Sequence, residues 1–81
     1  MNENELRAVV LDVLGQIAPE ADLGDLDPSG QLQEELDLDS INFLDFVSGL
    51  HDRTGVDIPE RAYPEVATLT GCVQYLHAHA A

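Results

Sequence analysis

Apolar residues recur at helical spacing in three parts of this chain, and no stretch alternates between apolar and polar residues as a half-buried β-strand does. This pattern restricts the fold to packed helices. The first stripe follows Asn2 and Glu5, which match a capping box, and Pro19 lies beyond its end. We therefore expect a helix over about residues 3–17. The stripe consists of Leu6, Val9, Val10, Val13, Leu14 and Ile17.

Residues 18–38 show no such periodicity and are rich in Pro, Gly, Ser and Asp. Asp27-Pro28-Ser29-Gly30 is a good turn signal. We expect a long loop here. A loop of this length is unusual in a small domain, which indicates either a functional segment or an element that the pattern does not reveal.

The second stripe predicts a helix over about residues 40–53, and Gly55 is placed to cap its C-terminus. The stripe consists of Phe43, Phe46, Val47 and Leu50, widened by Ile41 and Leu44. Two bulky rings are more than the stripe needs. One of them could project toward a partner or restrict an internal cavity.

Two further elements are expected before the C-terminus. Pro59 suits the first position of a short helix over about residues 59–63, which Pro64 should close. Thr68 suits the N-cap of a helix over about residues 68–78. Its stripe consists of Leu69, Cys72, Val73 and Leu76. Residues 1–81 should thus form a single all-α domain, a small four-helix bundle of three longer helices and one short helix.

The charge is strongly negative: sixteen acidic residues accompany three arginines and no lysine, for a formal net charge of -13. Such a chain repels nucleic acid and anionic membrane surfaces. Proteins with basic docking patches are the expected partners. Self-repulsion favours a monomer.

Cysteine usage and the N-terminal residues bear on the compartment. Cys72 has no partner for an internal disulfide, and the first residues lack the basic and apolar parts of a signal peptide. No apolar run approaches a membrane span. We expect a reducing, cytoplasmic setting.

Catalytic and metal-binding patterns are lacking. The three histidines, at 51, 77 and 79, form no metal-ligand pattern with Cys72, and no serine or cysteine has a histidine at motif spacing. A calcium loop begun at Asp25 would end on Leu36 instead of glutamate. We expect no catalytic residue and no metal site, and a structural role for Cys72 in the core.

Asp39 and Ser40 stand where the loop gives way to the second helix. Either could cap that helix by accepting a backbone N–H, which is worth about 1 kcal/mol. A serine at this place is also exposed and could carry a covalent group. The dipeptide by itself leaves both alternatives open.

From about Glu3 to Ala78 the chain resembles acyl carrier proteins, four-helix domains that carry acyl groups as thioesters on a phosphopantetheine arm. The resemblance implies that 4'-phosphopantetheine is attached covalently to Ser40 by a phosphopantetheinyl transferase, and that the protein itself is not an enzyme. It rests on three segments: Leu36-Asp37-Leu38-Asp39-Ser40-Ile41, which resembles the attachment motif, and Val56-Asp57-Ile58-Pro59 and Leu69-Thr70-Gly71-Cys72-Val73-Gln74-Tyr75-Leu76, which resemble the third and fourth helices.

The resemblance also implies further site residues. Acidic side chains of the second helix should meet Arg and Lys on the transferase and on acyl-loading and acyl-processing enzymes. The expected docking residues are Asp39, Ile41, Asn42, Asp45, Gly49 and Asp52. Some core residues could also border an acyl chain, namely Leu44, Val47, Leu50, Ile58 and Leu69.

Two departures from the family pattern concern partner choice. Asp37 occupies a place where glycine is common, so the loop should not depend on glycine's backbone freedom. Ser48 replaces a large apolar residue of the recognition helix. Fatty-acid, polyketide and specialised acyl pathways stay open. So do an aminoacyl or peptidyl carrier of a nonribosomal pathway and, in a different class, an acidic interaction module in which Ser40 is only a helix cap.

Overall fold

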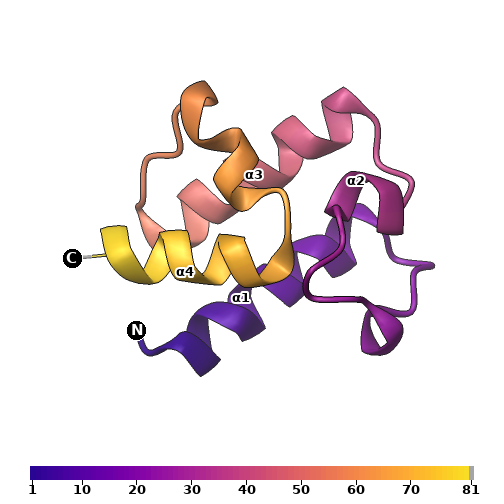
Figure 1. Cartoon of the computed structure of the whole chain (residues 1–81), viewed down its shortest axis with the longest axis horizontal. Coiled ribbons are helices and arrows are strands. Elements are labelled where there is room, and N and C mark those ends of the chain that lie inside the picture. The colour runs from indigo at the N-terminus through magenta and orange to yellow at the C-terminus, as the bar shows by residue number, and fades with distance from the viewer. Residues whose placement is uncertain (81) are drawn as a thin grey trace.

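The computed structural model describes residues 1–80, and within that range its regular elements are all helices (Figure 1). The predicted all-α bundle is confirmed. The three apolar stripes form the three longest helices. In chain order the elements are α1 (Glu3–Ile17), the 3-10 helix η1 (Leu23–Asp25), α2 (Leu32–Glu35), α3 (Ser40–Thr54), the 3-10 helix η2 (Glu60–Val66) and α4 (Leu69–His79).

Helix α1 begins with the capping box that its sequence predicts. The Asn2 side chain accepts from Glu5 N at 2.8 Å, and the Glu5 carboxylate accepts from Asn2 N at 3.3 Å. The helix then packs against both α3 and α4. Its apolar stripe thus faces the two other long helices.

The hydrophobic core lies among α1, α3, η2 and α4, and α2 adds one side chain to it. Burying one such side chain fully contributes about 1.5–3 kcal/mol. The side chains with the least exposure are Leu6, Val10, Leu14, Leu32, Phe46, Leu50, Val66, Leu69, Cys72 and Leu76.

The expected loop over residues 18–38 is more ordered than its sequence indicates. It contains η1 and α2, and Leu32 at the start of α2 has an exposed fraction of 0%. Two backbone hydrogen bonds tie the loop to the start of α4: Leu32 N donates to Ala67 O at 2.8 Å, and Thr70 N donates to Pro28 O at 3.0 Å. A helix as short as α2 is too brief to show a periodic stripe, so the pattern missed it.

Helix η2 also differs from the prediction, because Pro64 lies inside it and does not close it. Proline removes one backbone donor, but its fixed φ is compatible with helical backbone. Buried side chains on both sides of the proline, Ala62 and Val66, hold the segment against the core. Their burial explains why the helix runs on to Val66.

Candidate functional site

Ser40 is the first residue of α3, and the end of α2 determines where it lies. Leu36 N closes the last turn of α2 by donating to Leu32 O at 3.0 Å, and Leu38 N donates to Gln33 O at 2.9 Å, which is the 6→1 bond of a Schellman-type helix end. Leu38 is buried beneath the turn. Only Leu38 and Asp39 separate this turn from Ser40, so the serine is held at a fixed distance from α2.

Asp37 adopts the left-handed backbone conformation in this turn, with a φ of 53°. The expectation that the turn would not require such a conformation is therefore wrong. A glycine would adopt this φ without strain. Asp is among the few other residue types that enter this region, because its short polar side chain can hydrogen-bond locally.

The cap of α3 is Asp39 and not Ser40. The Asp39 carboxylate accepts from Asn42 N at 2.7 Å, and the Asn42 side-chain oxygen accepts from Asp39 N at 3.3 Å, which forms a capping box. Within residues 1–80 the Ser40 hydroxyl takes part in no hydrogen bond, and Ser40 is exposed. Its oxygen is therefore available for chemistry while the adjacent residue fixes the backbone.

The helix end also influences the electrostatics at Ser40. Unpaired N–H groups give the N-terminus of a helix a partial positive charge, which stabilises a nearby anion by about 0.3–1 kcal/mol. The exposed carboxylates of Asp37 and Asp39 oppose part of this effect. The site thus suits an attached anion but does not attract free ones strongly.

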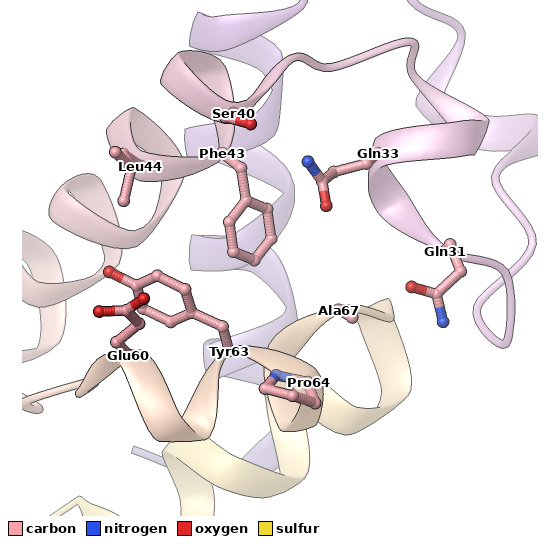
Figure 2. Close-up of a pocket in the computed structure, with 9 residues that line it drawn as sticks. All are labelled: Gln31, Gln33, Ser40, Phe43, Leu44, Glu60, Tyr63, Pro64 and Ala67. Atoms are coloured by element: carbon pink, nitrogen blue, oxygen red, sulfur yellow. The ribbon is translucent and has the colours of Figure 1, made fainter.

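A surface pocket of about 520 Å³ opens beside Ser40, between α3, α2 and η2 (Figure 2). The Phe43 ring projects from α3 into this region and meets Tyr63 of η2 edge-on, with ring centroids 5.5 Å apart. Gln31 and Gln33 approach from the α2 side. The complete lining is Gln31, Gln33, Ser40, Phe43, Leu44, Glu60, Tyr63, Pro64 and Ala67.

The exposed face of α3 differs in two places from the predicted docking stripe. A Cβ atom on Gly49 would lie 2.8 Å from Val13 Cγ1, so Gly49 packs against α1 and faces no partner. Asn42 is half-buried and engaged in the cap. The other predicted docking residues are exposed, with Ile41 at 69%.

Two exposed residues of this face lie outside the predicted docking set. Leu44, predicted to be core, has an exposed fraction of 49%, and Ser48 is exposed as well. The positions 41, 45, 48 and 52 share one side of a helix, a spacing that could have identified Ser48. We call Asp39, Ile41, Leu44, Asp45, Ser48 and Asp52 the exposed α3 face.

The residues predicted to border an acyl chain do not gather beside Ser40. Leu50, Leu69 and Val47 are buried, with exposed fractions of 0%, 1% and 7%. Val47 and the half-buried Ile58 border a second pocket, which has a volume of about 450 Å³. Residues from the C-terminal end of α3 also line this pocket. Of the predicted set only Leu44 lines the pocket at Ser40. Of the two rings, Phe46 is fully buried in the core, whereas Phe43 borders this pocket.

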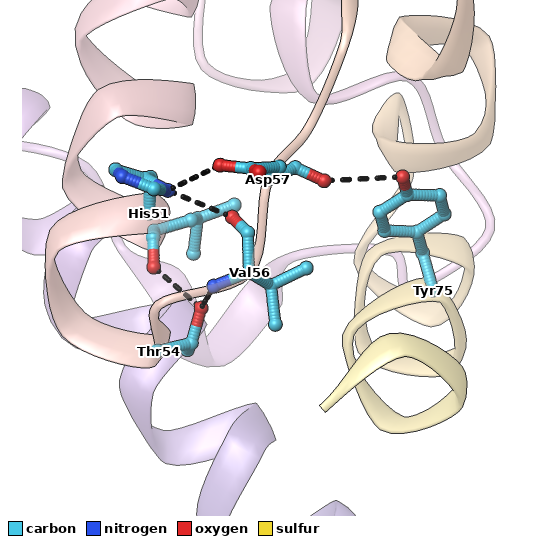
Figure 3. A network of polar contacts seen from close by, with 6 residues as sticks. His51, Thr54, Val56, Asp57 and Tyr75 are labelled. Carbon is cyan, nitrogen blue, oxygen red and sulfur yellow. Dashed lines mark hydrogen bonds and ion pairs between the residues drawn. The ribbon is translucent and has the colours of Figure 1, made fainter. Parts of the chain in front are cut away.

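The C-terminal end of α3 is fixed by a network of polar contacts (Figure 3). His51 Nδ1 lies 3.1 Å from Val56 O and 3.4 Å from Asp57 Oδ1, and Tyr75 donates its hydroxyl hydrogen to Asp57 O at 3.3 Å. Thr54 Oγ1 donates to Leu50 O at 2.7 Å.

Gly55 caps the C-terminus of α3, as the sequence predicts. Gly55 has a φ of 72° and caps the helix, its N–H donating to His51 O at 2.7 Å. Arg53 forms an ion pair with Asp12 of α1. This end of the helix is therefore tied to its surroundings by side chains and backbone alike.

Cys72 lies on the inner face of α4 with an exposed fraction of 0%. Burial raises the pKa of its thiol from 9.0 to about 12. The thiol therefore stays protonated and unreactive at neutral pH. The structural role predicted for Cys72 agrees with its place in the core.

Within residues 1–80, no three side chains among His, Cys, Asp and Glu gather as a group that could hold a metal ion. None of the helices in this range has the length and apolar character needed to cross a membrane.

Comparison with known proteins gives one family and several relatives. Residues 4–76 match the family model described as "Phosphopantetheine attachment site". An acyl carrier protein from Lactobacillus acidophilus is 27% identical over 79 residues, which cover 98% of each chain. An acyl carrier protein from Lactobacillus johnsonii is 36% identical over 47 residues, which cover 58% of this chain and 59% of the relative. The matched range includes Ser40, α3 and the pocket.

Proposed function

The chain belongs to the phosphopantetheine attachment-site family of acyl carrier proteins, which carry covalently bound 4'-phosphopantetheine, and we propose that it is a discrete carrier whose arm is attached to Ser40. The observation that carries this proposal is the free hydroxyl at the start of α3. Asp39 supplies the cap, so Ser40 has no structural bond to lose on modification. Because Asp39 is the N-cap of α3, the alternative in which Ser40 serves only as the helix cap is not supported.

The proposed modification makes Ser40 the nucleophile. A phosphopantetheinyl transferase brings coenzyme A, and Ser40 Oγ forms the new bond to phosphorus while the nucleotide part of coenzyme A leaves. The hydroxyl proton passes to a base of the transferase, because no hydrogen-bonded base accompanies Ser40 within residues 1–80. The thiol of the arm then carries the acyl group as a thioester. The chain itself catalyses none of these steps.

The exposed α3 face is the proposed docking surface for the transferase and for acyl-loading and acyl-processing enzymes. It combines two exposed apolar side chains beside Ser40, Ile41 and Leu44, with the carboxylates of Asp45 and Asp52. Basic patches on these enzymes would complement the carboxylates, speed association and make it sensitive to salt. The apolar pair would supply a small desolvated contact at the centre.

The pathway is proposed only as a class. Fatty-acid, polyketide and specialised acyl pathways all use such a carrier, and Asp37 and Ser48 favour a specialised one with its own partner enzymes. An intracellular setting, where coenzyme A and its transferases are found, fits this role. Intact mass of the protein purified from its own host would identify the acyl or aminoacyl group that it carries.

The attachment site is tested by incubation with a broad-specificity transferase and coenzyme A. We expect the intact mass to rise by one phosphopantetheine arm. The Ser40→Ala variant should gain nothing, whereas Ser29→Ala, which removes an exposed serine outside α3, should be loaded normally. No mass gain in the unmodified sequence, or an undiminished gain in Ser40→Ala, would refute the assignment.

The docking surface is tested by charge reversal. We expect Asp45→Arg and Asp52→Arg to lower kcat/KM of the transferase at low salt and to weaken its salt dependence. Asp25→Arg is the matched control, since it makes the same change in net charge on η1, outside α3. Equal effects of the three substitutions would mean that net charge matters and the surface does not.

A further inference from the structure

Of the residues that line the pocket at Ser40, only Phe43 also belongs to the buried core. Its ring lines the pocket, and the residue is also part of the buried core, with an exposed fraction of 7%. The centroid of its ring lies 5.5 Å from that of Tyr63 and 6.0 Å from that of Phe46, which is fully buried. Figure 2 shows the Phe43 ring lying below Ser40 and beside the Tyr63 ring.

The space behind Phe43 is occupied by side chains. Phe46, Leu50 and Leu69 have exposed fractions of 0%, 0% and 1%, and they belong to one contiguous core. Protein interiors are packed as densely as organic crystals, so methylene groups can enter only if side chains move out of the way. Three of the residues that could have bordered an acyl chain, Val47, Leu50 and Leu69, serve as core packing.

The pocket in front of Phe43 offers a different environment. Most of its lining residues are exposed, and its rim carries the amides of Gln31 and Gln33 and the carboxylate of Glu60. An alkyl chain lying there would stay partly in water. The amide-containing arm, or a short acyl group with hydrogen-bonding atoms, suits such a rim better.

We infer that Phe43 selects the cargo: it keeps alkyl chains out of the bundle, so this carrier is adapted to short or polar acyl groups held at the surface. The inference rests on the proposed attachment of the arm to Ser40. It goes beyond that proposal in naming the class of cargo and the residue that sets it. Removing the ring should open the core to an alkyl chain.

The test compares two loaded forms of the full chain, made with a broad-specificity transferase from acetyl-coenzyme A and octanoyl-coenzyme A. We expect their melting temperatures to agree within about 2 °C, because the octanoyl chain stays outside the core. In Phe43→Ala the octanoyl form should melt at least about 4 °C above the acetyl form, which in a domain of this size corresponds to about 1 kcal/mol of added stability. Leu11→Ala, which shortens a half-buried side chain of α1 away from the pocket, is the control and should show no octanoyl-dependent gain.

Either of two results would overturn the inference: an octanoyl form of the unmodified sequence that melts more than about 2 °C above its acetyl form, or no octanoyl-dependent gain in a folded Phe43→Ala. If Phe43→Ala does not fold, Phe43→Leu takes its place. Nuclear Overhauser contacts provide a second measurement on the unmodified sequence. Contacts from octanoyl methylenes to Leu50 or Leu69 methyls would refute the exclusion, and their absence would support it. Intact mass before each measurement shows whether Ser40 is loaded, so a failed attachment is distinguished from a failed exclusion.

Discussion

The start of α3 and the inner face of α4 each hold a side chain with a nucleophilic atom, and the two regions treat it in opposite ways. Ser40 is exposed, unbonded and beside a pocket, whereas Cys72 is fully buried, with its thiol pKa raised to about 12 by that burial. A thiol is intrinsically the stronger nucleophile. The comparison teaches that position in the fold, and not the chemistry of the side chain, decides which of the two can be modified.

The largest expected effect concerns the reactivity of Cys72 itself. A pKa of about 12 in place of 9.0 lowers the thiolate population near neutral pH about a thousandfold. We expect iodoacetamide to alkylate Cys72 at least about a thousandfold more slowly in the folded apo protein than in urea. The arm thiol of the loaded protein is the control and should react rapidly. If Cys72 were alkylated in the folded protein within tenfold of its rate in urea, burial would not protect the thiol, and the contrast with Ser40 would be refuted.

The second effect is a loss of stability at alkaline pH. The thiol pKa is higher in the folded state than in the unfolded state, so its contribution is fully present below about pH 9 and is lost as the pH rises toward about 12. Between pH 8 and pH 10.5 the free energy of unfolding should fall by about 2 kcal/mol from this group. Urea unfolding at the two pH values measures it. Cys72→Ala should lose about 2 kcal/mol less over the same range, and equal losses would show that Cys72 is not the source.

The third effect tests the cap that leaves Ser40 free. Asp39→Ala removes the acceptor for Asn42 N, and we expect it to lower the free energy of unfolding by about 1 kcal/mol. Asp39→Asn should retain most of the stability, because Asn caps helices about as well as Asp. Asp45→Ala, on the exposed α3 face, is the matched control and should have little effect. If Asp39→Ala were neutral, Ser40 would have to serve as a substitute cap, and the separation of roles would fail.

The smallest effect is a gain in stability at the turn before the site. Asp37 adopts a left-handed conformation that costs a residue with a Cβ atom about 1–2 kcal/mol, and Asp37→Gly removes this strain. Glycine's greater freedom in the unfolded chain offsets about half of the benefit, so we expect a net gain of about 0.5 kcal/mol in urea unfolding. Asp37→Asn, which removes the charge and keeps the side chain's shape, separates strain from electrostatics. If Asp37→Asn raised the free energy of unfolding as much as Asp37→Gly does, the loss of the charge and not the relief of strain would explain the gain.

Periodicity along the chain predicted the long helices well, because each buries an apolar stripe that recurs over several turns. The same reasoning was less reliable at the edges of a stripe. Leu44 is predicted on the buried side of α3 and is exposed, while Gly49 is predicted on the exposed side and packs on Val13. The close approach of α1 at a residue without a side chain decides how α3 is rotated, and hydrophobic spacing within α3 alone carries no information about that contact.

The sequence singles out Ser40 but not the surroundings of that residue. The Asp39-Ser40 pair alone leaves a helix cap and an attachment site open, and the resemblance of three segments to acyl carrier proteins favours attachment. The pocket beside it brings together residues from α2, α3 and η2 that are distant in sequence, so no local pattern reveals it. The left-handed turn at Asp37 was missed because glycine's absence was taken as evidence against it, whereas hydrogen bonds at the end of α2 impose it.

The two backbone bonds that join the long loop to the start of α4 divide that loop into parts that an engineer can treat differently. Residues 28–32 are bonded at both ends to the start of α4. Lengthening this segment would move α2, and the turn that positions Ser40, away from α4. The exposed residues Pro19 and Glu20 lie outside this segment. A reporter peptide or affinity tag inserted beside Glu20 would break one turn bond, from Ala21 N to Ala18 O, and add loop-closure entropy of about 0.6 kcal/mol for each doubling of loop length.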